Sequence, residues 1–475
     1  MKLQYEQKIH NYLQTHKQEI VETLKELIRI PSVRGEGEKN APFGKACANV
    51  LDLTEGLYKN NGFVTELDRE SGYLLSYYGE GDRSLGLFAH ADVVPVSGDW
   101  VYTEPFAPIE KEGCIIGRGA LDDKSAVVIS LYCAKMLKEL AIPFDSRLVL
   151  FTGSNEESGM EDIKHYISAH LPPRFSLVID TAFPLYRGNK GSLLFTAVCK
   201  KPVFSIKNMI ADNAKGAILG KIKIVLAYEK EVFAFLKANE SETISVTAEQ
   251  NEIIIEARGI SKHTALVEGS LNAGYPAFDL LSRCTYFSES DRAQFRFIAA
   301  LLSEYYGNAI GIENNDPDFG KLTFANDLVG VENGTLNLHF NLRFGAAVNR
   351  AALKEKIKKE FSQKDWEVEF EREAPAKLTD INDPMLQGCL NVYKEYTGDQ
   401  NAEISINAGG TYARYLPRAA EVGTTLCWDR PKGRPRGHGG AHQPDECISI
   451  DGLLGATECI ALMLLKADEL LKRDR

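Results

Sequence analysis

The strongest constraint on the fold is an alternation of short apolar segments with helical stretches near the start of this 475-residue chain. The expected buried strands are Ser84–Ala89, Arg147–Thr152 and Ser176–Ile179, and the expected helices are Lys124–Leu140 and Glu161–His170. Because strands that alternate with helices favour parallel pairing, we expect an α/β fold with a mostly parallel sheet flanked by helices. An amphipathic helix should come first, since apolar residues recur at helical spacing from Tyr5 to Ile28 and stop before Pro31.

The pattern changes after about residue 185 and returns near residue 381. Between these positions, strands such as Gly220–Ala227 and Glu252–Arg258 are interleaved with helices, which is typical of an α+β domain. The α/β pattern then resumes and closes with a long helix, Ser449–Leu471. We therefore expect one domain formed by residues 1–185 and 381–475, interrupted by an inserted domain of residues 186–380.

Composition excludes several classes of protein. Lys and Arg number 55 against 66 Asp and Glu, and the net charge of −11 argues against nucleic-acid binding. No apolar run approaches the roughly 18 residues that span a membrane, and the N-terminus lacks the apolar region of a secretory signal. We therefore expect a cytoplasmic protein. The nine cysteines form no C-x-x-C pair, which indicates reduced core thiols rather than disulfides or a thiolate zinc site.

Polar clusters follow the expected strands, and the carboxyl ends of strands in such a sheet border the ligand crevice. The first cluster is His90-Ala91-Asp92, directly after Ser84–Ala89. Alternate residues of an extended segment point the same way, so Asp92 can accept the second ring N–H of His90. That arrangement supports a metal-binding histidine, although such a pair taken alone is more often structural.

Four further clusters complete the set. Asp122-Asp123-Lys124 precedes an expected helix and, by itself, could be an acidic helix start favoured by the helix dipole. Glu156-Glu157 follows the strand Arg147–Thr152, in a turn where two adjacent carboxylates can diverge. Asp180 follows Ser176–Ile179, and His442 lies in a glycine-rich segment near the C-terminus.

Together these clusters supply two imidazoles and three carboxylates as direct ligands, a set suited to Zn²⁺, Mn²⁺ or Co²⁺. A carboxylate shared by two cations about 3.5–4 Å apart leaves an open edge for water and a substrate carbonyl. One glutamate of the adjacent pair can bind a cation while its neighbour faces the water and acts as a base. The clusters therefore predict metal-dependent hydrolysis of an amide bond.

The order of the motifs resembles a known family. His-x-Asp, Gly-Arg-Gly-x-x-Asp-Asp-Lys, Glu-Glu-x-Gly, Asp and His-x-x-Asp-Glu occur in this order in the co-catalytic metallopeptidase family of carboxypeptidase G, aminoacylase, succinyl-diaminopimelate desuccinylase and carnosinase. The resemblance spans nearly the whole chain and is closest to the bacterial dipeptidase V branch. It implies two divalent metal ions per subunit, with zinc favoured and manganese or cobalt as alternatives.

The resemblance also implies roles for single residues. His90 and Asp180 would bind one metal ion, Glu157 and His442 would bind the other, and Asp122 would bridge them. Glu156 would be the general base and proton shuttle, and Asp92 would orient His90. The peptide bond between Asp122 and Asp123 would be cis, as it often is in the family.

In the inserted domain, the resemblance implies that His263 reaches the scissile carbonyl and stabilises the oxyanion. Arg343 would anchor a substrate carboxylate, Asn208 would lie near the oxyanion, and the loop Gly409, Gly410 and Thr411 would bind a substrate terminus. The surroundings depart from the family pattern, since Ser205-Ile206-Lys207 replaces the glycines before Asn208 and Phe344-Gly345 replaces an aromatic-proline pair. Substrate preference is therefore less well defined than hydrolysis.

The leading hypothesis is a metal-dependent dipeptidase that cleaves short peptides. The alternative keeps the same site but hydrolyses N-acetyl or N-succinyl amino acids. A non-catalytic metal- or peptide-binding protein is a third reading, which the complete set of ligands and base disfavours. Family relatives with shorter lids dimerise through them. The resemblance, taken with an insertion of roughly 195 residues, therefore implies a lid that duplicates a ferredoxin-like unit, with His263 serving its own active site in a monomer.

Overall fold

The computed structural model describes residues 5–212, 215–426 and 431–473. The chain divides into two compact units, which we call the α/β unit (Met1–Asn189 with Leu378–Arg475) and the α+β unit (Lys190–Lys377). The expected boundaries at 185/186 and 380/381 differ from these by a few residues, because strand β8 (Leu185–Asn189) pairs with β20 (Ile404–Asn407) in the α/β unit. None of the described helices is long and apolar enough to cross a membrane.

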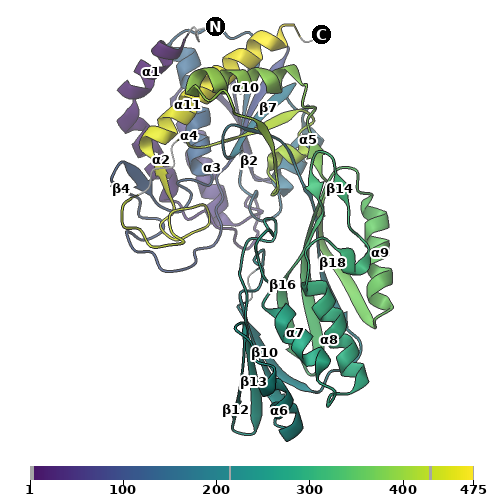
Figure 1. The fold of residues 1–475 in the computed structure, drawn as a ribbon. Coiled ribbons are helices and arrows are strands. Elements are labelled where there is room, and N and C mark those ends of the chain that lie inside the picture. The colour runs from purple at the N-terminus through teal and green to yellow at the C-terminus, as the bar shows by residue number, and fades with distance from the viewer. Residues whose placement is uncertain (1–4, 213–214, 427–430, 474–475) are drawn as a thin grey trace. The chain divides into compact units, whose positions relative to one another are not determined.

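The α/β unit is built on a nine-stranded sheet (Figure 1). Its order is β1 (Val64–Asp68), β2 (Tyr73–Tyr78), β6 (Arg147–Gly153), β3 (Ser84–His90), β7 (Phe175–Thr181), β21 (Ala419–Gly423), β8 and β19 (Lys377–Leu378), with β20 beside β8. The central strands β6, β3, β7 and β21 are parallel, and β1 and β2 form an antiparallel edge. The prediction of an α/β fold with a mostly parallel sheet is confirmed.

Side chains of the central strands alternate between two apolar layers. Leu85 and Leu87 of β3 join the core on one face, whereas Phe88 joins the core on the other. The first face is covered by α1 (Glu6–Thr15), α2 (Lys17–Ile28), α3 (Lys45–Asn60), α4 (Lys124–Glu139), α10 (Pro384–Thr397) and α11 (Ile450–Leu471). The opposite face is covered by α5 (Glu161–Ala169) and the short 3₁₀ helix η2 (Tyr412–Tyr415).

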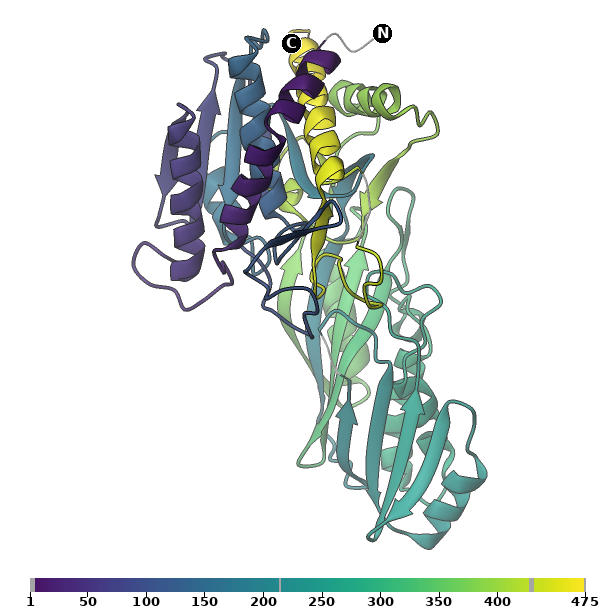
Figure 2. The same ribbon diagram turned by 90° about the vertical axis from the view of Figure 1, so that its left-hand side faces the viewer.

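The N-terminal and C-terminal helices lie side by side, α1 against α11 (Figure 2). The prediction of one opening helix was wrong in one respect, because the helix breaks at His16. The His16 ring bonds the Tyr12 carbonyl oxygen at 2.9 Å, and His16 leaves the helical conformation with φ −98° and ψ 9°. The eight cysteines that the structure describes are all buried, as expected for core thiols; the ninth, Cys427, lies outside the described residues.

A small antiparallel sheet lies beside the site described below. Its order is β22 (Cys447–Ser449), β5 (Cys114–Ile116) and β4 (Ile109–Lys111). The turn that contains Asp122 follows β5, and the loop that contains His442 precedes β22. Because β5 and β22 are hydrogen-bonded neighbours, this sheet brings two distant motifs together.

The α+β unit contains two four-stranded antiparallel sheets over one apolar core. We call one of them the outer sheet, because its strands come before and after the other sheet in the chain. It has the order β16 (Thr323–Glu332), β17 (Thr335–Phe344), β9 (Gly191–Cys199) and β18 (Trp366–Ala374), with helices α8 (Glu289–Leu302) and α9 (Arg350–Ser362). Its chain order β9, α8, β16, β17, α9, β18 is the β-α-β-β-α-β order of ferredoxin-like folds. A hairpin of β14 (Asn315–Asp316) and β15 (Gly320–Lys321) and the 3₁₀ helix η1 (Asn308–Ile310) precede β16.

The second sheet, which we call the inner sheet, is formed by the part of the chain between β9 and α8. Its order is β10 (Ile206–Ala211), β11 (Lys221–Ala227), β13 (Glu252–Arg258) and β12 (Ile244–Glu249), with helices α6 (Lys230–Ala238) and α7 (Gly274–Arg283). The inner half thus repeats four strands and two helices. In contrast to the outer half, its edge strand β10 comes first in the chain.

Candidate metal centre

Three neighbouring parallel strands deliver most of the candidate ligands. His90 is the last residue of β3, Asp180 lies near the end of β7, and Glu157 follows β6. All three strands run in the same direction, so their carboxyl ends meet at one edge of the sheet. The turn after β5 adds Asp122, and the loop before β22 adds His442.

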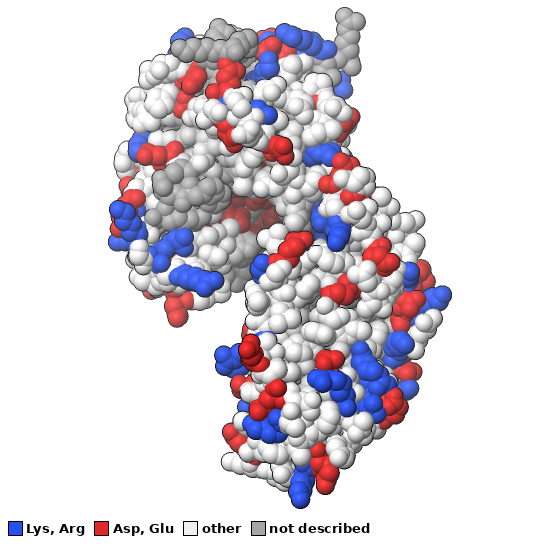
Figure 3. All heavy atoms as spheres, viewed as in Figure 1, with Lys and Arg blue, Asp and Glu red and all other residues white. Residues whose placement is uncertain are grey.

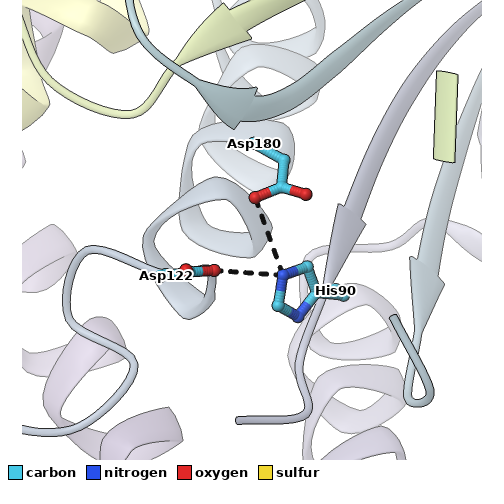
Figure 4. A group of neighbouring side chains, drawn as sticks. All are labelled: His90, Asp122 and Asp180. Atoms are coloured by element: carbon cyan, nitrogen blue, oxygen red, sulfur yellow. Dashed lines mark ion pairs between the residues drawn. The ribbon is translucent and has the colours of Figure 1, made fainter. Parts of the chain in front are cut away.

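The first group of ligand atoms surrounds His90 (Figure 4). Its Nε2 lies 3.2 Å from Asp122 Oδ1 and 3.7 Å from Asp180 Oδ1. The histidine is 1% exposed, whereas Asp122 and Asp180 are partly exposed. The three atoms are close enough together to hold one cation.

The second group uses the other oxygen of Asp122. His442 Nε2 lies 3.1 Å from Asp122 Oδ2 and 2.9 Å from Glu157 Oε1. The two oxygens of Asp122 therefore face different groups, as a carboxylate that bridges two cations requires. The structure brings together all five residues that the sequence singled out as metal ligands, and the Asp122–Asp123 peptide bond is cis, as expected.

The chemistry of the donor set fits divalent metal ions. Imidazole nitrogens and carboxylate oxygens are ligands for zinc, manganese and cobalt. Several buried carboxylates close together are costly unless positive charge balances them. Here three carboxylates, those of Asp122, Glu157 and Asp180, lie beside only two imidazoles, so part of their negative charge is not balanced by the protein.

Glu156 lies beside this centre with an unsatisfied atom. It is 7% exposed, and its Oε1 has no hydrogen-bond partner among the described residues. Burial, followed by the nearby charge of Asp180, raises the pKa of Glu156 well above its usual value. A carboxylate in this environment has a strong tendency to take up a proton.

The histidines of the two groups hold protons strongly. Burial alone would lower the pKa of His442, but the hydrogen bonds to Asp122 and Glu157 outweigh it and raise the pKa to about 11. For His90, burial opposes the charged form in the same way, and Asp122 and Asp180 again raise its pKa. Since a ligating imidazole must be neutral, metal binding would compete with these protons.

Asp92 connects the two candidate catalytic segments. Its main-chain oxygen is the nearer partner of His90 Nδ1, at 3.0 Å, and its carboxylate Oδ1 lies at 3.4 Å. The carboxylate also accepts hydrogen bonds from the backbone N–H groups of Glu156 at 3.1 Å and Glu157 at 3.2 Å. Asp92 therefore fixes the turn of the two glutamates relative to His90, a function that the sequence did not indicate.

Two buried carboxylates hold the backbone of the site and were missed as site residues. Glu446 accepts hydrogen bonds from the backbone of Asp122 at 3.0 Å and from Arg118 Nη1 at 2.6 Å. Asp162 accepts from the N–H groups of Ser154 and Asn155, each at 2.8 Å. Glu446 belongs to the His-x-x-Asp-Glu motif, so a signal existed for it, whereas nothing in the local sequence distinguishes Asp162.

Replacing Glu446 by alanine is expected to lower the free energy of unfolding by about 3–5 kcal/mol, because the fully buried Arg118 would lose its charged partner. Urea unfolding of the purified variant measures this loss. Asp451→Ala, which breaks the exposed pair between Lys17 and Asp451, is the control and should cost at most about 1 kcal/mol. Equal losses in the two variants would contradict the assigned role of Glu446.

The loop Gly409–Thr411 belongs to the α/β unit and rests on a buried carboxylate. Glu421 of β21 is 0% exposed and accepts hydrogen bonds from Asn189 at 3.0 Å and Asn407 at 2.8 Å. Asn407 Oδ1 in turn accepts from the N–H of Gly409 at 2.8 Å, and Thr411 caps η2 by accepting from the N–H of Ala413. Burial raises the pKa of Glu421 to about 7, against the effect of these bonds.

This pKa makes stability depend on pH. Because the pKa of Glu421 in the folded protein lies above its ordinary value of about 4.5, unfolding releases protons between pH 4.5 and 7, and stability falls as pH rises through that range. The loss should be about 3 kcal/mol above pH 7. In Glu421→Gln, urea unfolding between pH 4.5 and 8 should show a flatter profile than wild type; identical slopes would refute the assignment.

The remaining candidate residues lie in the α+β unit. His263 is an exposed residue whose Nδ1 accepts a hydrogen bond from the N–H of Ala265 at 3.1 Å. Arg343 lies on β17, opposite Ser192 of β9. Asn208 is exposed on β10, next to an irregularity in its pairing with β11.

Charged side chains of both signs are mixed over one face of the molecule. Figure 3 shows Lys and Arg interspersed with Asp and Glu over the face in view.

Sequence and fold comparisons give one consistent result. A profile of the family described as "Peptidase family M20/M25/M40" matches residues 86–466. A Bacillus subtilis (strain 168) protein named "Putative dipeptidase YtjP" is 28% identical over 470 residues, covering 94% of this chain and 96% of the relative.

Two solved structures share the fold over almost the entire chain. Di-peptidase Dug1p from Saccharomyces cerevisiae has a TM-score of 0.61 at 13% identity and covers 99% of both chains. Human carnosine dipeptidase 1 has a TM-score of 0.58 at 13% identity and covers 98% of this chain and 100% of that chain.

Proposed function

The chain belongs to peptidase family M20/M25/M40 and is a peptidase, and from this we propose that it is a metal-dependent dipeptidase. The observation that carries the proposal is the pair of ligand groups that share Asp122, with the buried carboxylate of Glu156 beside Glu157. The names of its relatives support the choice of substrate, since YtjP, Dug1p and carnosine dipeptidase 1 are all named as dipeptidases.

Two divalent metal ions, zinc by preference, would be held by the two groups. His90 and Asp180 would bind one ion, Glu157 and His442 the other, and Asp122 both. Bound there, the ions would supply Lewis acidity, which polarises a carbonyl group and makes water more acidic. Asp92 would keep His90 and the two glutamates in place through the bonds described above.

Glu156 would act as the general base. Its unpartnered Oε1 would take a proton from the attacking water and then pass it to the amine that leaves when the peptide bond breaks. The raised pKa fits this cycle, because the group must hold the proton between the two transfers. Burial also keeps bulk water from competing for that proton.

Residues of the α+β unit would complete the reaction. His263 would donate a hydrogen bond to the developing oxyanion, and Arg343 would hold the substrate carboxylate through its planar guanidinium group. Asn208 would lie near the oxyanion, and the loop Gly409, Gly410 and Thr411 would bind a substrate terminus. We propose that the α+β unit acts as a lid and that His263 serves its own chain in a cytoplasmic monomer.

Hydrolysis assays with metal-depleted protein reloaded separately with Zn²⁺, Mn²⁺ and Co²⁺ test the function. Dipeptides should be cleaved faster than N-acetyl and N-succinyl amino acids. Faster cleavage of the acyl amino acids would instead establish the deacylase alternative, and stoichiometric metal binding without any hydrolysis would indicate a binding protein. Mixing His263→Ala with Glu156→Gln protein should restore no activity, since recovery would require His263 to act across subunits.

A further inference from the structure

A buried aspartate–histidine pair lies in the α+β unit, outside the candidate metal centre. Asp327 is the extra residue of a β-bulge in β16, where the pairing with β17 shifts between Asn326 and Leu328. It is 0% exposed and accepts a hydrogen bond from Nδ1 of His339, which is 3% exposed. Bulges re-aim side chains, and this one directs a carboxylate into the interior of the unit.

The second oxygen of Asp327 holds the segment next to His263. It accepts a hydrogen bond from the N–H of Gly216 at 2.8 Å, and the carbonyl of Gly216 accepts from the N–H of Thr264 at 2.8 Å. Ala217 forms an antiparallel bridge with His263 itself. Hydrogen bonds therefore connect the buried pair, through Gly216, to the backbone of Thr264, the residue after His263.

The glycine lies against the imidazole. A Cβ atom placed on Gly216 would be 3.8 Å from His263 Nε2, and the φ of +86° at Gly216 is one that side chains with a Cβ rarely adopt. The close approach therefore places the backbone of Gly216 beside the side chain that the sequence assigned to oxyanion stabilisation. A displacement of the Gly216 backbone would therefore change the contacts of the His263 imidazole.

Apolar packing and a second polar contact fix the rest of the loop to the same strand. Ile218, which follows the bridge partner of His263, and Val267, four residues after His263, pack in a small buried cluster with Ala325 of β16. Asn326, the neighbour of Asp327, accepts a hydrogen bond from Asn272 at 3.3 Å. The part of β16 around the bulge therefore contacts both the segment from Gly216 to Ile218 and the segment that follows His263.

The loop also fixes the tautomer of His263. Because the N–H of Ala265 donates to Nδ1, the proton of the neutral imidazole is carried by Nε2. An oxyanion-stabilising histidine must present an N–H donor. The position and the proton of the imidazole are therefore both set by the loop that rests on Asp327.

We propose that Asp327, together with His339, is a positioning residue for His263, acting through Gly216. This inference rests on the proposed function of His263. Asp327 touches neither substrate nor metal in this account, and its contribution to turnover passes entirely through the position of the imidazole. His339 keeps the carboxylate of Asp327 in the orientation that reaches Gly216.

A double-mutant cycle tests the proposal. In the metal-loaded enzyme, His263→Ala should lower kcat about 10²–10³-fold. Asp327→Ala should lower kcat roughly tenfold with KM changed less than threefold, and should lower it less than twofold further in the His263→Ala background. Asp327→Asn, which keeps the shape and one acceptor oxygen, should lie between wild type and Asp327→Ala. Asp291→Asn is the control. Asp291 is another carboxylate of the α+β unit and accepts a hydrogen bond from the Ser205 hydroxyl, and its replacement should leave kcat unchanged.

A spectroscopic readout separates this inference from the proposed function. In ¹⁵N-histidine-labelled protein, the ring signal that disappears in His263→Ala should move in Asp327→Ala and stay in place in Asp291→Asn. An unmoved signal, or an equal loss of kcat in both backgrounds, would overturn the proposal. A wild-type enzyme that cleaves no dipeptide would refute the proposed function, and the ring signal would still decide whether Asp327 positions His263.

Discussion

Replacing Glu156 by glutamine is expected to lower kcat for dipeptide hydrolysis about a thousandfold while metal content stays at the wild-type level. Glutamine has the same shape but cannot accept the proton of the attacking water, and general-base catalysis contributes roughly 10²–10⁴-fold. The backbone N–H of residue 156 can still bond Asp92, so the turn should persist. Steady-state kinetics with metal analysis of the same sample measure both effects.

A matched control for this variant is Glu458→Gln. Glu458 is also a buried carboxylate of the α/β unit, 4% exposed in α11, but its partner is His10. Its replacement should leave kcat within about twofold of wild type, because it is outside the centre. Near wild-type turnover in metal-loaded Glu156→Gln would eliminate Glu156 as the base.

Asp122→Ala is expected to remove metal from both groups and to lower kcat about a thousandfold or more. The two oxygens of Asp122 face His90 and His442 separately, so a single truncation takes one ligand from each group. The Lewis acidity of a bound cation is worth several kcal/mol in the transition state, and about 4 kcal/mol corresponds to a thousandfold. Equilibrium dialysis followed by metal analysis gives the stoichiometry.

His442→Ala provides the comparison, since it takes a ligand from one group and leaves the group of His90 and Asp180 intact. It should weaken one metal site and leave the other at wild-type affinity. If Asp122→Ala still bound two ions with wild-type affinity, or if both variants lost the same single ion, Asp122 would not be a bridge.

The sequence predicted the centre of the α/β unit well, and physical reasons explain why. Strands that are buried on both faces are continuous apolar runs, and the expected Arg147–Thr152 matches β6 to within one residue at its end. Because parallel strands end at a common edge, polar residues after each run could be assigned to one site before any contact was known. His90, Glu157 and Asp180 were singled out in this way, whereas Asp122 and His442, which lie in the turn after β5 and the loop before β22, were singled out by the order of the motifs.

What the sequence did not reveal depends on pairing between distant segments. β9 lies between β17 and β18, whose residues follow it by more than a hundred positions, and no local pattern specifies such neighbours. The same holds for Asp327, whose carboxylate bonds the N–H of Gly216 more than a hundred positions earlier, and for Asp162, which accepts a hydrogen bond from the distant hydroxyl of Tyr412. Burial of a polar side chain is visible only once its partners are placed.

The position of β21 has a consequence for the order in which the protein can form during synthesis. This strand, Ala419–Gly423, lies between β7 and β8 in the large sheet, although it follows them in the chain by more than two hundred residues. The inner sheet of the α+β unit, in contrast, uses only the contiguous segment from β10 to α7. A nascent chain that has emerged only to residue 400 can therefore contain a complete inner sheet while the large sheet still lacks β21, the strand between β7 and β8. The candidate metal centre at the edge of that sheet can be completed only after β21 and His442 have left the ribosome.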